Sequence, residues 1–394
     1  AIEYARNGLP VSPVVARCWL EAYRDYRENL QGGEFENWFK TFAPKGRAPR
    51  SGEIWNSPEH ASTLEKIAET YSDAFYRGEL AEKIDKFSRE YGGYLRKEDL
   101  DVFEPKWVKP IGVNYKGFDI WEIPPNGQGM VALLTLNILK GFELNGKEDV
   151  ETYHKQLEAI KLAFADGKKY ITDIDEMAIE PQSFLSDEYA EERRRLITDN
   201  ATMPIAGRPQ GGGTVYLSAV DCDGNMVSYI QSNYRGFGSG LVVPGTGIAL
   251  QNRGADFSLK VEDANCLKPG KRSYHTIIPG FITKGNQAVG PFGVMGAYMQ
   301  PQGHVQAVMN MIDFNLNPQE ALDAPRWQWV GDNTVFVESH FPKNIATKLW
   351  DKGHDIRIQL DNTSFGRGQI ILRNDEGVFV GGTESRADSS IAVW

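Results

Sequence analysis

The sequence of 394 residues is poor in the residue types that build disulfide frameworks and metal centres. It has only three cysteines, Cys18, Cys222 and Cys266, which form no close pair, and the odd count favours free thiols. Its six histidines lie far apart along the chain, and neither a His-Glu-x-x-His nor a Cys-x-x-Cys pattern is present. We therefore expect neither a metal ion nor a cofactor.

Apolar runs long enough to cross a membrane and runs of basic residues are also absent. No stretch of about 18 apolar residues that could cross a membrane is present, and no secretory signal is visible. The formal net charge of −10, without any run of Lys or Arg, disfavours nucleic acid and anionic membranes as partners. The composition, with 41% hydrophobic and 24% charged residues, is that of a globular protein with a large core.

Glycine is abundant, and three consecutive glycines at 211–213 precede Thr214. Small and apolar residues alternate over 214–220 and again over 226–232, on either side of an Asp-Gly pair. This alternation predicts two antiparallel strands joined by a tight loop.

The length of that loop decides which residues of the two strands face each other. A three-residue loop at 222–224, with Gly224 in the left-handed conformation, sets Thr214 opposite Ser232 on the same face. A two-residue turn would instead pair Thr214 with Asn233. We predict the first register.

The glycines also make the Gly213-Thr214 bond a candidate for chemistry, because glycine lets the backbone take strained conformations. Attack on this bond by the hydroxyl of Thr214 would cut the chain there. The cut would leave Thr214 with a free α-amine beside its hydroxyl, which is one way to activate a threonine nucleophile. A flexible glycine linker that runs into an ordinary strand is the alternative reading.

Recognisable motifs cover nearly the whole chain, in one consistent order. Downstream of Thr214 they are DCDGNMVSYIQSNYRGFGSGLVVPGTGIALQNRGADFS, GKRSYHTIIPGFI, PFGVMGAYMQPQGHVQAVMNMID and FGRGQIILRNDEGVFVGGTESRADSS. Upstream they are AFYRGELAEKI, GGYLRKEDLDVF, PPNGQGM and KLAFADGKKYITD. These motifs resemble the small and large subunits of γ-glutamyltranspeptidases, which belong to the N-terminal-nucleophile hydrolases.

The resemblance implies an α+β fold and a division of the chain. The fold would be an αββα sandwich, in which two stacked, mainly antiparallel sheets are flanked by helices. Residues 1–213 would form the C-terminal part of the large-subunit region, and 214–394 would form the small-subunit region that begins with the nucleophile. Both regions together would form one interwoven domain.

The resemblance also implies roles for five residues. Thr214 matches the nucleophile, and Ser232 matches the hydroxyl that hydrogen-bonds it. Gly296 and Ala297 match a Gly-Gly pair whose N–H groups form the oxyanion hole, and such donors act through position, so the alanine is tolerated. Asp256 matches the carboxylate that pairs with the substrate's α-ammonium group. A loop aspartate that caps a turn is the alternative for Asp256.

Four further positions near the expected acyl pocket depart from the family pattern. His275 and Thr276 stand where the family has paired serines for the substrate's α-carboxylate. Arg253 replaces a glutamine near the ammonium group, and Tyr234 replaces an asparagine. An arginine at this place could receive a carboxylate directly. For His275, a loop histidine with satisfied hydrogen bonds is the alternative to a substrate contact.

The sequence therefore predicts an enzyme of the γ-glutamyltransferase or glutathione hydrolase type. We expect it to cleave itself at Gly213-Thr214 and to act on γ-glutamyl amides such as glutathione, by hydrolysis or by acyl transfer. A glutaryl- or cephalosporin-type acylase stays open as an alternative. An unprocessed, catalytically silent binding protein also stays open.

Partners and location follow from the same resemblance. We expect a small-molecule amide substrate, no cofactor, and a large and a small subunit after self-cleavage, with a dimer of these heterodimers left open. The chain opens inside the family's large subunit, so we expect an upstream portion, with its carboxylate-binding arginine and any export signal, to be missing. We expect a cytoplasmic location, and a periplasmic or extracellular one stays open.

Overall fold

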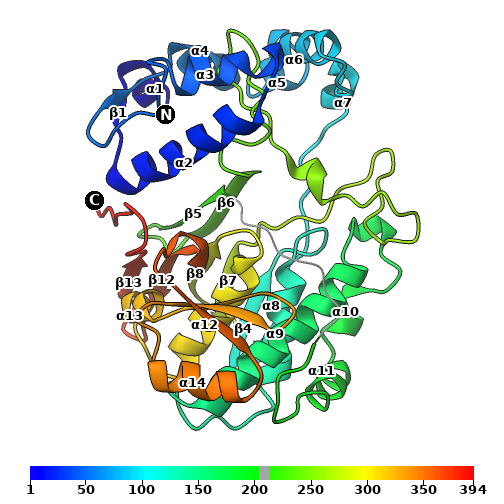
Figure 1. Cartoon of the computed structure of the whole chain (residues 1–394), viewed down its shortest axis with the longest axis vertical. Coiled ribbons are helices and arrows are strands. Elements are labelled where there is room, and N and C mark those ends of the chain that lie inside the picture. The colour runs from blue at the N-terminus through cyan, green and yellow to red at the C-terminus, as the bar shows by residue number, and fades with distance from the viewer. Residues whose placement is uncertain (204–212) are drawn as a thin grey trace. The chain divides into compact units, whose positions relative to one another are not determined.

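The computed structural model describes residues 1–203 and 213–394, which form two compact units (Figure 1). The first unit consists of 1–107 and 233–252, and the second of 108–232 and 253–394. Residues 204–212, which a proline- and glycine-containing sequence predicts to form an exposed loop before Thr214, lie outside the described residues. In the part of the chain that is described, no helix is long and apolar enough to span a membrane.

The first unit is mainly helical around an aromatic core in which Trp19, Trp38, Phe42 and Phe237 pack together. Its elements are α1 (Ile2–Asn7), β1 (Leu9–Pro10), α2 (Pro13–Asn29), η1 (Gly33–Phe35), α3 (Glu36–Phe42), β2 (Ile54–Trp55), α4 (Pro58–Glu69), α5 (Asp73–Tyr76), α6 (Glu79–Glu90) and α7 (Lys97–Asp101). β1 and β2 pair antiparallel. These aromatic side chains therefore form the core of the first unit.

A six-stranded antiparallel sheet organises the second unit, with strand order β13-β12-β8-β7-β4-β3 (Figure 1). Its strands are β3 (Ile111–Tyr115), β4 (Phe118–Glu122), β7 (Gly280–Lys284), β8 (Gln287–Met295), β12 (Arg367–Arg373) and β13 (Phe379–Thr383). β4, from before Thr214, pairs with β7, from after it. The two regions of the chain that flank the expected cleavage point therefore share one sheet.

Helices and a hairpin cover the two faces of this sheet. The hairpin consists of β5 (Gly213–Val220) and β6 (Met226–Tyr234), and β5 lies against β8 and β12. On β8, Gly293 faces the ring of Tyr216 in β5, whereas Val294 faces Gly303 in α12 (Met299–Ile312). Successive strand residues point to opposite faces, so the hairpin and α12 lie on opposite sides of the sheet.

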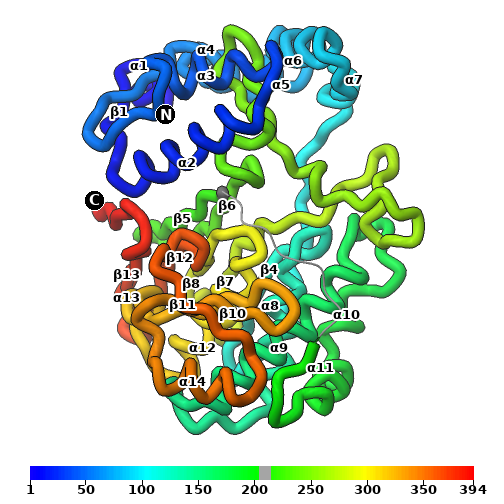
Figure 2. Tube along the Cα trace, in the orientation of Figure 1, coloured from blue at the N-terminus to red at the C-terminus, as the bar shows by residue number. Residues whose placement is uncertain are grey.

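The predicted α+β class with stacked antiparallel sheets is confirmed, and two long helices complete the core. α8 (Gly129–Leu139) is buried on all sides and packs against β3, β4 and α12. α9 (Val150–Tyr170) lies beside α8 (Figure 2). α8 covers the nearly all-apolar run at 130–139, a composition that indicates a buried helix.

The remaining elements frame this core. They are η2 (Ile174–Glu176), α10 (Pro181–Phe184), α11 (Asp187–Arg194), η3 (Arg253–Asp256), α13 (Pro318–Asp323), β9 (Trp327–Gly331), β10 (Thr334–Glu338), α14 (Lys343–Asp351), β11 (Asp355–Gln359) and η4 (Thr363–Phe365). β9, β10 and β11 form a small separate sheet.

The C-terminal motif GGTESRADSS supplies ion pairs to the core. Arg386 pairs with Glu338 at 2.6 Å and with Glu384 at 2.7 Å, and Arg326 pairs with Glu384 at 2.8 Å. All four side chains are buried. Because buried charges are tolerated only when paired, this motif serves the fold. All three cysteines are free thiols, as predicted.

Candidate active site

The hairpin carries the candidate nucleophile, Thr214, and its hydrogen-bond partner. The Thr214 hydroxyl Oγ1 donates to Oγ of Ser232 at 3.0 Å. At the other end of the hairpin, the Asp221 N–H donates to the Asn225 carbonyl at 3.1 Å, and Gly224 has φ of 86°. These contacts define a three-residue loop, so the predicted register is confirmed.

Close packing against the sheet fixes the start of this hairpin. Thr214 is 6% exposed, and Tyr216, two residues further on the same face, lies over Gly293 of β8. A Cβ at Gly293 would meet the Tyr216 ring at 2.5 Å, so only glycine allows this approach. The Tyr216 hydroxyl also hydrogen-bonds Ser228 at 2.8 Å. The nucleophile therefore stands on a strand held by packing rather than on a free loop.

Ser232→Ala is expected to lower kcat by about twofold to tenfold, because it removes one neutral hydrogen bond, worth roughly 0.5–1.5 kcal/mol, from the nucleophile. The matched control is Ser228→Ala, which removes a hydroxyl from the same face of the hairpin without touching Thr214. Steady-state turnover of a chromogenic amide measures both variants, and circular dichroism checks the fold. A kcat of Ser232→Ala equal to that of the parent would contradict the role of Ser232.

Arg253 brings a positive charge next to this pair of hydroxyls. Its Nη2 donates to Ser232 Oγ at 3.2 Å, and its Nη1 donates to Thr276 Oγ1 at 2.6 Å. The guanidinium is buried, and Arg253 is 5% exposed. A single hydroxyl therefore separates the nucleophile from a buried cation, which favours negative charge nearby.

Asp256 lies in the same cluster and is already part of an ion pair. Its Oδ2 is 3.6 Å from Nη1 of Arg253, and the Tyr298 hydroxyl donates to its Oδ1 at 3.4 Å. The structure thus brings Asp256, Arg253 and Thr276 together with Thr214 and Ser232. Whether Asp256 receives a substrate ammonium stays a prediction.

His275 adjoins this cluster as a neutral side chain. Burial, with the Arg253 charge as a smaller cause, lowers the pKa of His275 to about 3. Its Nδ1 accepts a hydrogen bond from the N–H of Ile277 at 3.2 Å, which leaves the proton on Nε2. His275 therefore makes the internal bond expected of a loop histidine, and its role as a substrate contact stays a prediction.

Tyr234 falls in the first unit, two residues after Ser232 along the chain. It is a buried residue with φ of 74°, in the left-handed region that non-glycine residues seldom occupy. Its role in substrate binding stays a prediction.

Gly296 and Ala297 form the turn between β8 and α12. Their φ angles are 143° and 50°, so Ala297 keeps a left-handed backbone that glycine would take more easily. The turn stands at the N-terminus of a 14-residue helix, where backbone N–H groups carry partial positive charge. This location suits the predicted oxyanion role.

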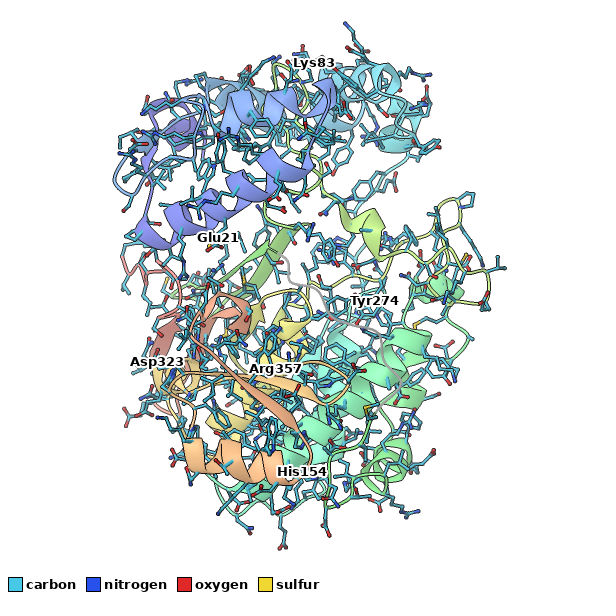
Figure 3. All side chains as sticks on the ribbon, in the orientation of Figure 1. Glu21, Lys83, His154, Tyr274, Asp323 and Arg357 are labelled. Atoms are coloured by element: carbon cyan, nitrogen blue, oxygen red, sulfur yellow. The ribbon has the colours of Figure 1, made fainter. Side chains whose placement is uncertain are left out.

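Gln128 is a residue at the site that the sequence analysis missed. Its Nε2 donates to the carbonyls of Thr276 and Ala297, both at 2.8 Å. Its Oε1 accepts a bond from the hydroxyl of Tyr274 at 3.2 Å (Tyr274 is labelled in Figure 3). The buried amide of Gln128 thus joins the backbone at Thr276 to the turn at Gly296 and Ala297. Its place in the PPNGQGM motif was the only signal that could have pointed to it.

A second buried polar cluster lies on α9, and it contains metal-type ligands. His154, Glu158 and His354 place ligand atoms within 4.8 Å of one another, and His154 Nδ1 is 2.9 Å from His354 Nε2 (His154 is labelled in Figure 3). In the sequence His154 and His354 are 200 residues apart, and this separation gave no indication that their side chains meet. However, Nζ of Lys161 donates to Glu158 at 2.7 Å, so the cluster already holds a cation from the chain itself. We interpret it as a structural ion pair.

Comparisons with known proteins agree with this architecture. The family model described as gamma-glutamyltranspeptidase matches residues 1–394. The glutathione hydrolase-like YwrD proenzyme of Bacillus subtilis is 34% identical, over 99% of this chain and 74% of that protein. The oxamate amidohydrolase proenzyme of Klebsiella pneumoniae is 32% identical, over 100% and 75%. The crystal structure of a cephalosporin acylase from Bacillus halodurans superposes with a TM-score of 0.97 at 58% identity, covering 100% of this chain and 73% of that one.

Proposed function

Because the chain belongs to the γ-glutamyltranspeptidase family, whose model spans all of it, we propose that it cleaves itself at Gly213-Thr214 and then uses Thr214 as its nucleophile. It is an enzyme of the N-terminal-nucleophile hydrolase type. Self-cleavage is supported by the relatives, several of which are named proenzymes.

The proposed reaction is hydrolysis of an amide through an acyl-enzyme. The hydroxyl of Thr214 attacks the amide carbonyl, and its free α-amine takes the proton and returns it to the leaving amine. Ser232 orients the hydroxyl, and the N–H groups of Gly296 and Ala297 hold the oxyanion. Water, or a second amine in the case of transfer, then releases the acyl group.

The acyl group in this proposal carries a carboxylate, as in a glutaryl-type acylase. The observation behind it is Arg253, whose guanidinium touches Ser232 beside the nucleophile. Arginine matches a carboxylate with two parallel hydrogen bonds. One relative fits this reading by name, the oxamate amidohydrolase, since oxamate is an amide that bears its own carboxylate.

Hydrolysis of γ-glutamyl amides such as glutathione is the second candidate. It is favoured by Asp256, a carboxylate in the same cluster that could receive the α-ammonium group. It is also supported by relatives named glutathione hydrolases, including that of Escherichia coli, which is 29% identical.

Arg253→Gln should abolish a preference of the parent enzyme for glutaryl over γ-glutamyl p-nitroanilide. The expected loss in kcat/KM on the glutaryl substrate is about tenfold or more, because a hydrogen bond between charged groups contributes about 1.5–3 kcal/mol. The ratio of the two substrates is the readout, since Arg253 also touches Ser232 and could slow both reactions. A γ-glutamyl preference in the parent that collapses in Asp256→Ala would instead establish the second candidate.

The two fragments of a cleaved chain would stay together in this proposal. The division into 1–213 and 214–394 assigns β4 to one fragment and β7 to the other, and these strands pair in the central sheet. A cytoplasmic location and a dimer of heterodimers stay predictions.

A further inference from the structure

Lys168, in the last turn of α9, is a charged residue near Asp256 that has no role in the mechanism above. Its Nζ lies 5.1 Å from the centroid of the Tyr298 ring. The hydroxyl of Tyr298 donates to Asp256, and Tyr298 directly follows Ala297 in the oxyanion turn. α9 therefore brings a second cation to the side of Asp256 on which Tyr298 lies.

A comparison with the neighbouring Lys169 shows that the end of α9 does not itself require a lysine against Tyr298. Both Lys168 and Lys169 stand in the last turn of α9, where a cation is favoured by the helix dipole. Lys169 is exposed and lies over the ring of Tyr170, whereas Lys168 is half-buried against Tyr298. Either lysine can stabilise the C-terminal end of α9 through the helix dipole. Only Lys168, which lies over Tyr298, faces the candidate site.

The charge state of Lys168 follows from its surroundings. Burial lowers the pKa of Lys168 to about 8, and the Asp256 carboxylate opposes that shift. Lys168 is therefore mostly protonated at neutral pH, and Arg253 is always charged. Among the described residues of this cluster, the two cations Arg253 and Lys168 and the carboxylate of Asp256 leave one net positive charge.

We propose that Lys168 is a specificity-determining residue, which together with Arg253 selects an acyl group of one net negative charge. This inference rests on the proposed function. A glutaryl-type acyl group, with a carboxylate and no ammonium, has that charge. A γ-glutamyl group is zwitterionic at its α-carbon and would leave one cation uncompensated, which is unfavourable in a partly buried site. Asp256 then holds the two cations in place instead of receiving a substrate ammonium.

The test compares Lys168→Met, Lys168→Arg and the matched control Lys169→Met, each in the full-length, self-cleaved protein. Glutaryl, γ-glutamyl and butyryl p-nitroanilides serve as anionic, zwitterionic and neutral acyl groups. Lys168→Met should lower kcat/KM by about tenfold on the glutaryl substrate, mainly through KM, and leave the butyryl substrate nearly unchanged. Lys168→Arg and Lys169→Met should behave like the parent.

Two results would overturn the inference alone. One is an equal loss of kcat/KM on all three substrates in Lys168→Met, which would mean a purely structural role. The other is an effect of Lys169→Met as large as that of Lys168→Met. It would mean that any positive charge near the site raises kcat/KM on the glutaryl substrate, without a specific role for Lys168. A parent protein that never cleaves itself and hydrolyses none of the anilides would overturn the proposed function, and the inference with it.

Discussion

Thr214→Ala should abolish both self-cleavage and amide turnover, and the variant should persist as a single chain of 394 residues or its full-length equivalent. One hydroxyl serves both reactions, and in a related nucleophile mechanism loss of the nucleophile lowers kcat by about six orders of magnitude. Gel electrophoresis follows cleavage, and anilide hydrolysis follows turnover. The fold should stay intact, because only a hydroxyl and a methyl group are lost from a strand held by packing.

Thr214→Ser is the matched control for this variant, since it keeps the hydroxyl and should still cleave itself and turn over substrate. Partial processing or measurable turnover in Thr214→Ala would remove Thr214 from the centre of the mechanism. A cleavage point other than Gly213-Thr214 in the parent would do the same.

Lys161→Met should be the most destabilising of the substitutions considered, with a loss of about 3–5 kcal/mol in the free energy of unfolding. The Lys161 ammonium is fully buried and bonds Glu158 at 2.7 Å, the Thr202 carbonyl at 3.1 Å and Asn333 at 3.2 Å. Its removal leaves the carboxylate of Glu158 buried without its cation. Urea unfolding of parent and variant measures the loss.

The control is Lys40→Met, which breaks an ion pair with Glu36 of similar sequence spacing at 3.1 Å on the surface. That pair should contribute no more than about 0.5 kcal/mol. The double variant Glu158→Gln/Lys161→Met should recover part of the stability, because no buried charge remains. Equal losses for Lys161→Met and Lys40→Met would contradict the ion-pair reading.

The parts of the site that the sequence predicted are those set by local rules. The strand period of two and the length of the loop after Asp221 determine which residue faces Thr214, so the contact with Ser232 could be predicted. The left-handed Gly224 fits the same rule. The nearly all-apolar run at 130–139 indicates a buried helix such as α8, because such a run has few alternatives in a folded core.

The parts that could not be predicted depend on contacts between distant segments. Gln128 reaches Thr276 and Ala297, which follow it by 148 and 169 residues. His154 in α9 and His354, just before β11 and 200 residues away, lie 2.9 Å apart through their ring nitrogens. No local sequence pattern encodes such long-range contacts, because they form only when the helices and the sheet pack together.

Burial was equally invisible in the sequence, and it changes the chemistry of several groups. An ordinary histidine has a pKa near neutral pH. Burial lowers the pKa of His275, so that its side chain stays uncharged. Arg253 was expected near the acyl group, but its bonds to Ser232 and Thr276 follow from where η3 sits against the hairpin and the 275–276 loop. These contacts are the basis on which we propose a substrate with a carboxylate.

The most direct test of the central claim is intact-protein mass spectrometry of the purified full-length protein. Self-cleavage predicts two fragments that meet at Gly213-Thr214, with a free threonine at the N-terminus of the smaller one. A single chain that persists after prolonged incubation would contradict it, and would favour a catalytically silent binding protein instead.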